Sequence, residues 1–214
     1  MSALTLPAPT APPAPPAAPP NPFAHLPPVR PLRWTREEYY RLAEAGFFAG
    51  KRVMLIHGEV MEMAPQNDPH VWGIINTQTA LLAALGGQFT YRPQMPLNLG
   101  QTSDPEPDLA FIAGPPRTQP RPHPSTAALV VEVADSSLAY DTGDKASLYA
   151  AGGIADYWVL DLVHRRLIVY RDPRPDAAAR FGHSYTAIKY HGADEAVAPL
   201  AAPSVPIPVA DLLS

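Results

Sequence analysis

The sequence predicts a mixed α/β domain in which a central β-sheet is flanked by helices. Apolar residues recur at helical spacing over residues 70–85, which indicates one long helix. Short runs rich in β-branched residues at 108–113 and 128–135 indicate buried strands. Since helical and extended segments are mixed along the chain, a sheet with helices packed against it would bury both kinds of apolar surface.

The first 31 residues differ in composition from the rest of the chain. Twelve of the 29 prolines lie there, and no Asp, Glu, Lys or Arg precedes Arg30. Proline removes a backbone donor and fixes φ, so we expect residues 1–31 to form a disordered Pro/Ala-rich tail. This tail is either a docking arm for a partner that binds proline-rich segments or a passive extension. Residues 32–214 are then expected to form a single domain.

The beginning of this domain is predicted to hold two helices separated by a hairpin. A capping box starts a helix over residues 35–48. Residues 53–63 read as a hairpin with His57 and Gly58 at its turn. The long helix over residues 70–85 follows.

Most of the remaining sequence is predicted to be extended. The expected elements are a strand at 88–97 interrupted by prolines, strands at 108–113 and 128–135, a helix at 141–151 capped by Asp141, a hairpin at 156–170, a strand at 184–190 and a short helical turn at 208–213. A Pro-rich loop at 114–125 carries Arg117, Arg121 and His123, which either contact a polyanion or are simply solvated.

Composition restricts the classes of function. The formal net charge of −4 gives no whole-protein attraction to nucleic acid or to anionic membranes. The absence of cysteine excludes disulfides and thiolate zinc sites. No apolar run approaches the roughly 20 residues of a spanning helix, and the N-terminus lacks the features of a signal peptide. A cytoplasmic protein without a membrane partner is therefore expected.

Two acids and a lysine stand at the edges of the predicted elements. Asp108 opens a strand, and Glu132 interrupts an otherwise apolar run. A carboxylate inside such a run is costly unless it is paired, protonated or bound to a metal. Lys145 falls in the first turn of the predicted 141–151 helix, where the helix dipole disfavours cations. The alternative is an ordinary surface pair between Asp141 and Lys145 at i, i+4.

The order Pro107-Asp108, Glu132 and Lys145 resembles the PD-(D/E)XK nuclease superfamily, and more closely its Uma-two family of restriction endonucleases. The resemblance covers residues 35–171. Further matching residues are Gly58-Glu59, Val131 and Val133, Ser136-Ser137, Tyr140-Asp141, Tyr149, Gly152 and Tyr157-Trp158.

This resemblance implies a fold and a reaction. The fold would be a restriction-endonuclease-like core with a central mixed β-sheet, preceded by an extra N-terminal helix and hairpin. The reaction would be hydrolysis of phosphodiester bonds in DNA. The protein would be able to form a homodimer. Asp108, Glu132 and the backbone carbonyl of Val133 would hold Mg²⁺ or Mn²⁺. Lys145 would activate the attacking water.

Other residues are candidates for additional roles at such a site. They are Glu59, His70, Asp141 and Tyr149. His70 would contact phosphate or a metal-bound group, although a lone histidine is commonly a cap or a packing residue.

Two positions depart from the pattern. Ala134 stands where the simplest superfamily pattern has its lysine, so the resemblance assigns that role to Lys145 on the following helix. His57 stands where the family usually has an acid before Gly-Glu.

Three hypotheses follow. The first is a metal-dependent deoxyribonuclease. The second is a catalytically inactive member of the same fold that binds nucleic acid or a protein partner, which the net acidity favours. The third is a metal-free hydrolase with Asp108 and Glu132 as an acid–base pair, as in glycosidases. Lys145 favours the first.

Overall fold

The computed structural model describes residues 30–119 and 122–213. The chain divides into two units, Met1–Pro31 and Leu32–Ser214, and the fold below is that of the second unit. Nearly all of the expected tail, and also Arg121, lie outside the described residues.

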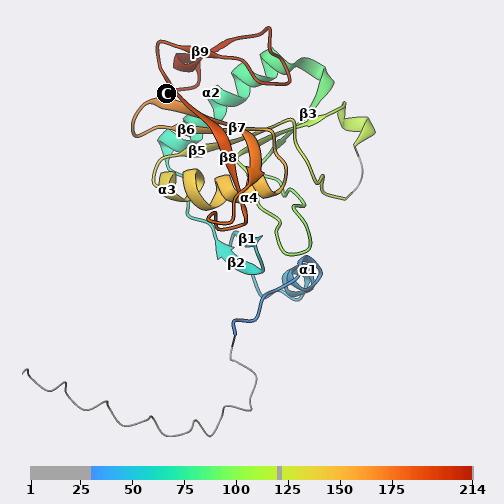
Figure 1. The fold of residues 1–214 in the computed structure, drawn as a ribbon. Helices are drawn as coiled ribbons and strands as arrows, with labels where there is room; N and C mark the ends of the chain where they lie inside the picture. Colours follow the sequence, from blue (N-terminus) through green and yellow to red (C-terminus); the bar gives the residue numbers. More distant parts are fainter. Residues whose placement is uncertain (1–29, 120–121, 214) are drawn as a thin grey trace, which may run out of the picture. The chain divides into compact units, whose positions relative to one another are not determined.

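A six-stranded sheet forms the centre of this unit (Figure 1). Its strands, in spatial order, are β3 (Phe89–Pro93), β4 (Leu109–Ala113), β5 (Leu129–Ala134), β6 (Asp156–Asp161), β7 (Arg166–Pro175) and β8 (His183–Gly192). Strands β5 and β6 are parallel, and every other neighbouring pair is antiparallel. The predicted class, a mixed α+β fold with a central mixed sheet flanked by helices, is confirmed.

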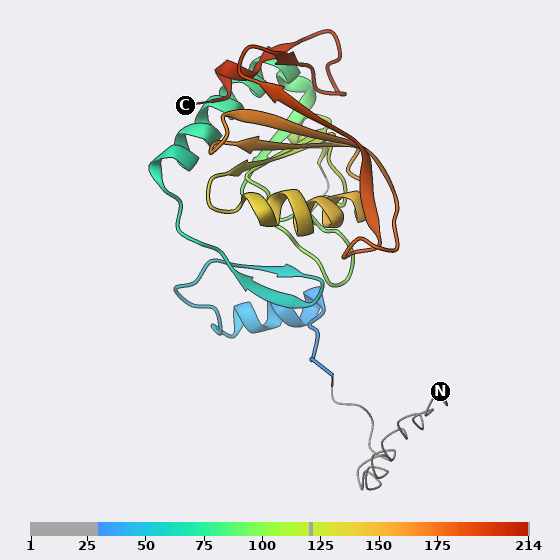
Figure 2. The same ribbon diagram turned by 60° about the vertical axis from the view of Figure 1, so that its left-hand side comes forward.

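Strand β5 is buried along its whole length because helices cover both faces of the sheet (Figure 2). Val131 and Val133 pack with the residues of α2 (Asp68–Leu85). Val130 and Ala134 point the other way and pack with α4 (Ala146–Ala151). Side chains alternate between the faces of a strand, so Glu132 lies on the α4 side. This position puts a carboxylate into a covered layer.

The N-terminal part of this unit is a helix and a separate hairpin. Helix α1 (Arg36–Glu44) begins with the predicted capping box. It ends four residues before the predicted Phe48, because Gly46 adopts a φ of 82° and breaks the helical path. Strands β1 (Val53–Ile56) and β2 (Glu59–Glu62) pair across the predicted His57-Gly58 turn.

The helical run before β6 begins earlier than predicted. It consists of α3 (Leu138–Tyr140), a π-helical turn η3 (Asp141–Lys145) and then α4. Its N-cap is Ser137, whose carbonyl accepts the amides of Tyr140 and Asp141. Asp141 is therefore not the N-cap, and Lys145 lies in the middle of the run rather than in its first turn. A π turn inside a helix often marks a functional site.

The rest of the fold differs from the prediction in detail. Strand β3 ends at Pro93 rather than at residue 97, because proline cannot donate to the sheet. The C-terminal segment adds a small sheet of β9 (Ala196–Val197) and β10 (Ile207–Pro208), which the sequence did not indicate, before the 3₁₀ turn η4 (Val209–Asp211). Short 3₁₀ turns also occur at η1 (Gly86–Gln88) and η2 (Pro116–Thr118). Across the described part of the chain, no helix combines the length and apolar character of a membrane span.

Candidate active site

The register of two strands brings Asp108 and Glu132 together. Leu109 pairs with Val131 in the antiparallel β4–β5 ladder, so the preceding Asp108 lies opposite Glu132. The amide of Asp108 lies 3.4 Å from Oε2 of Glu132. The amide of Val133 donates to Oδ2 of Asp108 at 2.9 Å. The Asp108 carboxylate, just before the first residue of β4, thus accepts the Val133 amide in place of a backbone carbonyl.

Glu132 is held from the α4 side of the sheet. The Tyr149 hydroxyl donates to its Oε1 at 2.7 Å, and the Lys145 ammonium lies 2.8 Å from its Oε2. Only 1% of Glu132 is exposed. Burial, reinforced by the nearby carboxylates of Asp108 and Asp141, raises the pKa of Glu132 to about 8 against the opposing effect of Lys145. Lys145 therefore offsets only part of the cost of burying this carboxylate.

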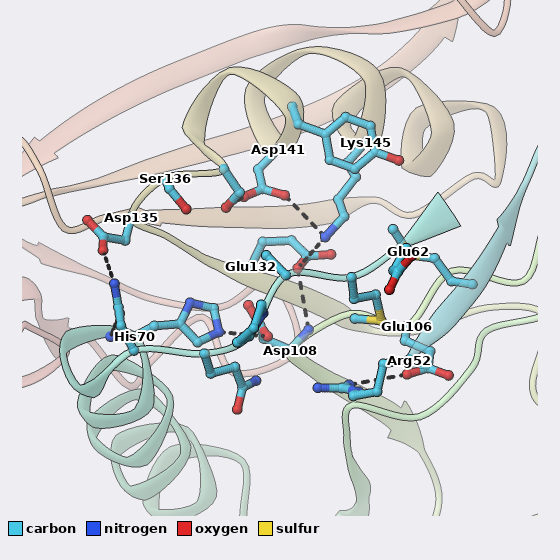
Figure 3. Close-up of a pocket in the computed structure, with 18 residues that line it drawn as sticks. Arg52, Glu62, His70, Glu106, Asp108, Glu132, Asp135, Ser136, Asp141 and Lys145 are labelled. Atoms are coloured by element: carbon cyan, nitrogen blue, oxygen red, sulfur yellow. Dashed lines mark hydrogen bonds and ion pairs between the residues drawn. The ribbon is translucent and has the colours of Figure 1, made fainter. Parts of the chain in front are cut away.

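Lys145 reaches Glu132 because the π turn directs it inward (Figure 3). Its ammonium also lies 3.1 Å from Oδ1 of Asp141. Burial acts to lower the pKa of Lys145, but the charges of Glu132, Asp141 and Asp108 outweigh it and raise that pKa. Lys145 therefore keeps its positive charge. The expected i, i+4 pair with Asp141 exists, but it is buried and shared with Glu132 rather than lying on the surface.

Asp141 is fixed on two sides. Its Oδ2 accepts a hydrogen bond from the Ser137 hydroxyl, and its backbone carbonyl accepts one from the Tyr157 hydroxyl at 2.8 Å. Asp141 is itself almost fully buried. A carboxylate held in this way fixes the direction of the Lys145 side chain.

His70 approaches Asp108 from the first turn of α2. Asn67 caps this helix by accepting the His70 amide at 3.1 Å, and the ring Nε2 of His70 lies 3.2 Å from Oδ1 of Asp108. Burial acts to lower the pKa of His70, but the hydrogen bond and charge of Asp108 outweigh it and raise that pKa. His70 therefore orients Asp108 and partly balances its charge.

Gln94 also contacts Asp108, although no pattern in the sequence indicated it. Its backbone has a φ of 47°, which is rare for a residue other than glycine. Its amide donates to the carbonyls of Pro107 and Asp108, both at 3.1 Å. Its side-chain nitrogen lies 3.5 Å from Oδ1 of Asp108. The only sequence signal was a glutamine close to the proline that ends β3.

Several candidates lie away from this group. Glu59 pairs with Arg33 at 2.9 Å and with Arg180 at 3.9 Å, and it does not line the cavity beside Asp108. Among the basic residues of the Pro-rich loop, Arg117 is exposed and His123 contacts Arg92 at 3.1 Å. Arg52 and Glu106, which were not candidates, do line the cavity, and the Arg52 guanidinium lies 3.4 Å from the Glu106 carboxylate.

Comparison with known proteins identifies the family of this chain. Residues 36–210 match the Uma2 family, described as "putative restriction endonuclease". The chain belongs to the Uma2 family. No curated protein matches the chain. Family and fold together support a restriction-endonuclease-like nuclease, a hydrolase that acts on nucleic acid.

One solved structure shows that the Uma2 fold seen here has been observed before. It is described as a putative nuclease belonging to DUF820 from Anabaena variabilis ATCC 29413. The two share 11% sequence identity with a TM-score of 0.62, and the match covers 84% of this chain and 97% of the other. At this identity the likeness concerns the fold alone.

The Uma2 site contains the donors that a hard divalent cation prefers. A cavity of about 180 Å³ is lined by several carboxylates, among them Asp108, Glu132 and Asp141, and by the Lys145 ammonium. The Val133 carbonyl shares the strand edge of its amide and therefore also faces Asp108. No group of three or more His, Asp or Glu side chains with metal-site geometry occurs among the described residues. Mg²⁺ commonly uses one or two carboxylates and keeps several waters, so this donor set fits it.

Proposed function

We propose that this chain is a metal-dependent endonuclease that hydrolyses phosphodiester bonds in DNA. The observation that carries the proposal is the meeting of Asp108 and Glu132 where β4 begins, with the Lys145 ammonium 2.8 Å from Glu132. This arrangement combines oxygen donors for a cation with a fixed positive charge. The restriction-endonuclease description of the family favours DNA as the substrate.

The acids would hold the cation and the lysine would act on the reacting groups. Mg²⁺ or Mn²⁺, bound by Asp108, Glu132 and the Val133 carbonyl, would polarise the scissile phosphate and lower the pKa of a bound water. The Lys145 ammonium orients the attacking water by a hydrogen bond and stabilises the negative charge that develops on the phosphate oxygens.

The surrounding residues keep these groups in place. His70 and Gln94 position Asp108. Tyr149 positions Glu132, and Asp141 positions Lys145. Each of these four residues holds Asp108, Glu132 or Lys145 in place without itself contacting the cation or the substrate. We therefore assign all four a positioning role.

Cleavage of supercoiled plasmid and of single-stranded DNA, with Mg²⁺ or Mn²⁺ and with EDTA, tests the proposal. The variants are Asp108→Asn, Glu132→Gln and Lys145→Met, with Glu37→Gln on α1 as a control for loss of an exposed acid. We expect cleavage that requires metal, is lost in all three site variants and is retained in the control. Cleavage that persists in Glu132→Gln and Lys145→Met would contradict the assignment.

A second function has one observation in its favour. The net charge of −4 gives no general attraction to DNA. This charge favours a catalytically inactive protein of the same fold that binds a protein or a nucleic acid through a local surface. If the wild type cuts no nucleic acid and binds no divalent cation, this second function replaces the first.

A further inference from the structure

Arg52 brings a positive charge into the cavity from outside the six-stranded sheet. It directly precedes β1, the first strand of the N-terminal hairpin. Its side chain lines the same cavity as Asp108 and Glu132. In the view of Figure 3, these two acids lie between Lys145 and Arg52. Two separate parts of the fold, the hairpin and the helical layer, therefore each present a cation to one cavity.

The Arg52 guanidinium uses little of its capacity to donate hydrogen bonds. Within the part of the chain that the structure describes, its one hydrogen bond runs to Oε2 of Glu106 at 3.4 Å, which is long for such a bond. A guanidinium carries five N–H donors, and 46% of this side chain is exposed. The Lys145 ammonium, by contrast, is buried between Glu132 and Asp141. Arg52 is therefore the better placed of the two cations to bind a group that arrives from solution.

The partner of Arg52 indicates the chemistry of that group. The Glu106 carboxylate presents two oxygens that share one negative charge, and so do the two unesterified oxygens of a phosphodiester. The planar fork of a guanidinium matches both groups. An ion pair that is partly exposed and this long contributes little free energy, because 21% of Glu106 and 46% of Arg52 remain open to water. A backbone phosphate is therefore able to replace Glu106 at low cost.

We propose that Arg52 binds a backbone phosphate of the DNA that enters the cavity, and that this phosphate displaces Glu106 from the guanidinium. The proposal rests on the proposed function, because it takes DNA as the substrate. It supplies a local attraction for DNA that the net charge of −4 does not provide. It also gives the hairpin a role in holding the strand, whereas the sheet and the helical layer carry the groups assigned to the reaction.

Fluorescence anisotropy of a labelled DNA duplex with the full-length chain tests the phosphate contact. EDTA in the buffer prevents metal-dependent cleavage, so the signal reports binding alone. We expect Arg52→Gln to raise the Kd about tenfold at low salt and to reduce the slope of log Kd against log salt by about one, as loss of one phosphate contact does.

Lys51→Gln is the matched control for loss of a positive charge. Lys51 is the neighbouring residue and pairs with Glu62 at 2.9 Å, but it does not line the cavity. We expect it to change the Kd by less than about threefold, because salt screens a charge outside the contact. Circular dichroism verifies that both variants are folded. Equal losses in Arg52→Gln and Lys51→Gln, or a wild type that binds no DNA, would overturn the proposal.

A double-mutant cycle tests the displacement of Glu106. Glu106→Gln frees the guanidinium, so we expect DNA to bind several-fold more tightly, and we expect most of this gain to disappear when Arg52→Gln is also present. Glu62→Gln removes another acid that lines the cavity, and its effect should be the same with and without Arg52. If the gain from Glu106→Gln is also independent of Arg52, Glu106 acts only through its charge and the displacement is wrong.

Cleavage assays of the same proteins with Mg²⁺ separate this proposal from the proposed function. Metal-dependent cleavage by the wild type, together with DNA binding that does not depend on Arg52, would overturn the phosphate contact alone. DNA binding that depends on Arg52, without any cleavage by the wild type, would overturn the nuclease function and support the phosphate contact.

Discussion

The ammonium of Lys145 lies 2.8 Å from Oε2 of Glu132, although the two residues belong to different elements. Glu132 lies in strand β5, and Lys145 lies in the π turn in the middle of the helical crossover to the parallel strand β6. The simplest pattern of the superfamily would place this lysine on β5 at the position of Ala134. Here the helix supplies the same charge to the same acid from the covering layer.

Replacement of Lys145 by methionine should greatly reduce catalysis. The variant removes the ammonium that faces Glu132 and Asp141, so the developing charge on the phosphate loses its stabilisation. Loss of one such group typically costs about 100- to 1000-fold in kcat. The measurement is the DNA cleavage rate in Mg²⁺. Lys189→Met on the exposed strand β8 should cut at the wild-type rate, and equal losses in both variants would rule out a specific role for Lys145.

Removal of the Tyr149 hydroxyl should affect activity and stability together. Tyr149→Phe leaves a buried Glu132 oxygen without its 2.7 Å donor, which should lower the free energy of unfolding by about 1–3 kcal/mol. The Tyr185 hydroxyl makes a comparable buried bond of 2.8 Å to the Ile154 carbonyl, outside the site. We expect similar destabilisation in urea for Tyr149→Phe and Tyr185→Phe, with the cleavage rate reduced only in Tyr149→Phe. A rate that falls equally in both would mean that stability alone explains the effect.

Gly73 should not tolerate a side chain, because α2 packs closely against β5 there. A Cβ at Gly73 would lie 2.8 Å from Cγ1 of Val133 and 3.4 Å from Cδ2 of Leu162. Gly73→Ala should therefore lower the free energy of unfolding by about 1–3 kcal/mol. At Gly87 a Cβ would meet nothing within 4 Å, so Gly87→Ala should change stability by less than about 0.5 kcal/mol. Chemical denaturation distinguishes the two, and an unchanged Gly73→Ala would argue against this packing.

Asp161 should make stability fall in acid. Burial acts to raise its pKa, but hydrogen bonds from the His164 amide and ring and from the Arg166 guanidinium outweigh burial and hold the pKa below its usual value of 3.8. A lowered folded-state pKa contributes stability above the unfolded pKa, and this stability is lost as the pH falls through the folded value. Wild type should therefore lose melting temperature more steeply than Asp161→Asn below about pH 4. Parallel melting curves at acid pH for the two proteins would contradict this contribution.

Much of the sheet was predictable, because short apolar runs rich in β-branched residues favour buried strands over other structures. The two acids were predictable for the same reason, since a carboxylate within such a run needs a partner. The cap at Ser137 and the π turn were not predictable, because they depend on contacts of Asp141 with Ser137, Tyr157 and Lys145. Gln94 was missed because its contacts with Asp108 and Pro107 join segments that only the folded chain brings together.

Titration calorimetry of Mg²⁺ into the wild type and into Glu132→Gln tests the central claim that Asp108 and Glu132 form one cation site. Glu132→Gln keeps the shape of the side chain and removes its charge. We predict saturable binding of about one ion to the wild type and a loss of affinity of at least about tenfold in Glu132→Gln. Identical Mg²⁺ binding by the two proteins, or none by either, would contradict the claim.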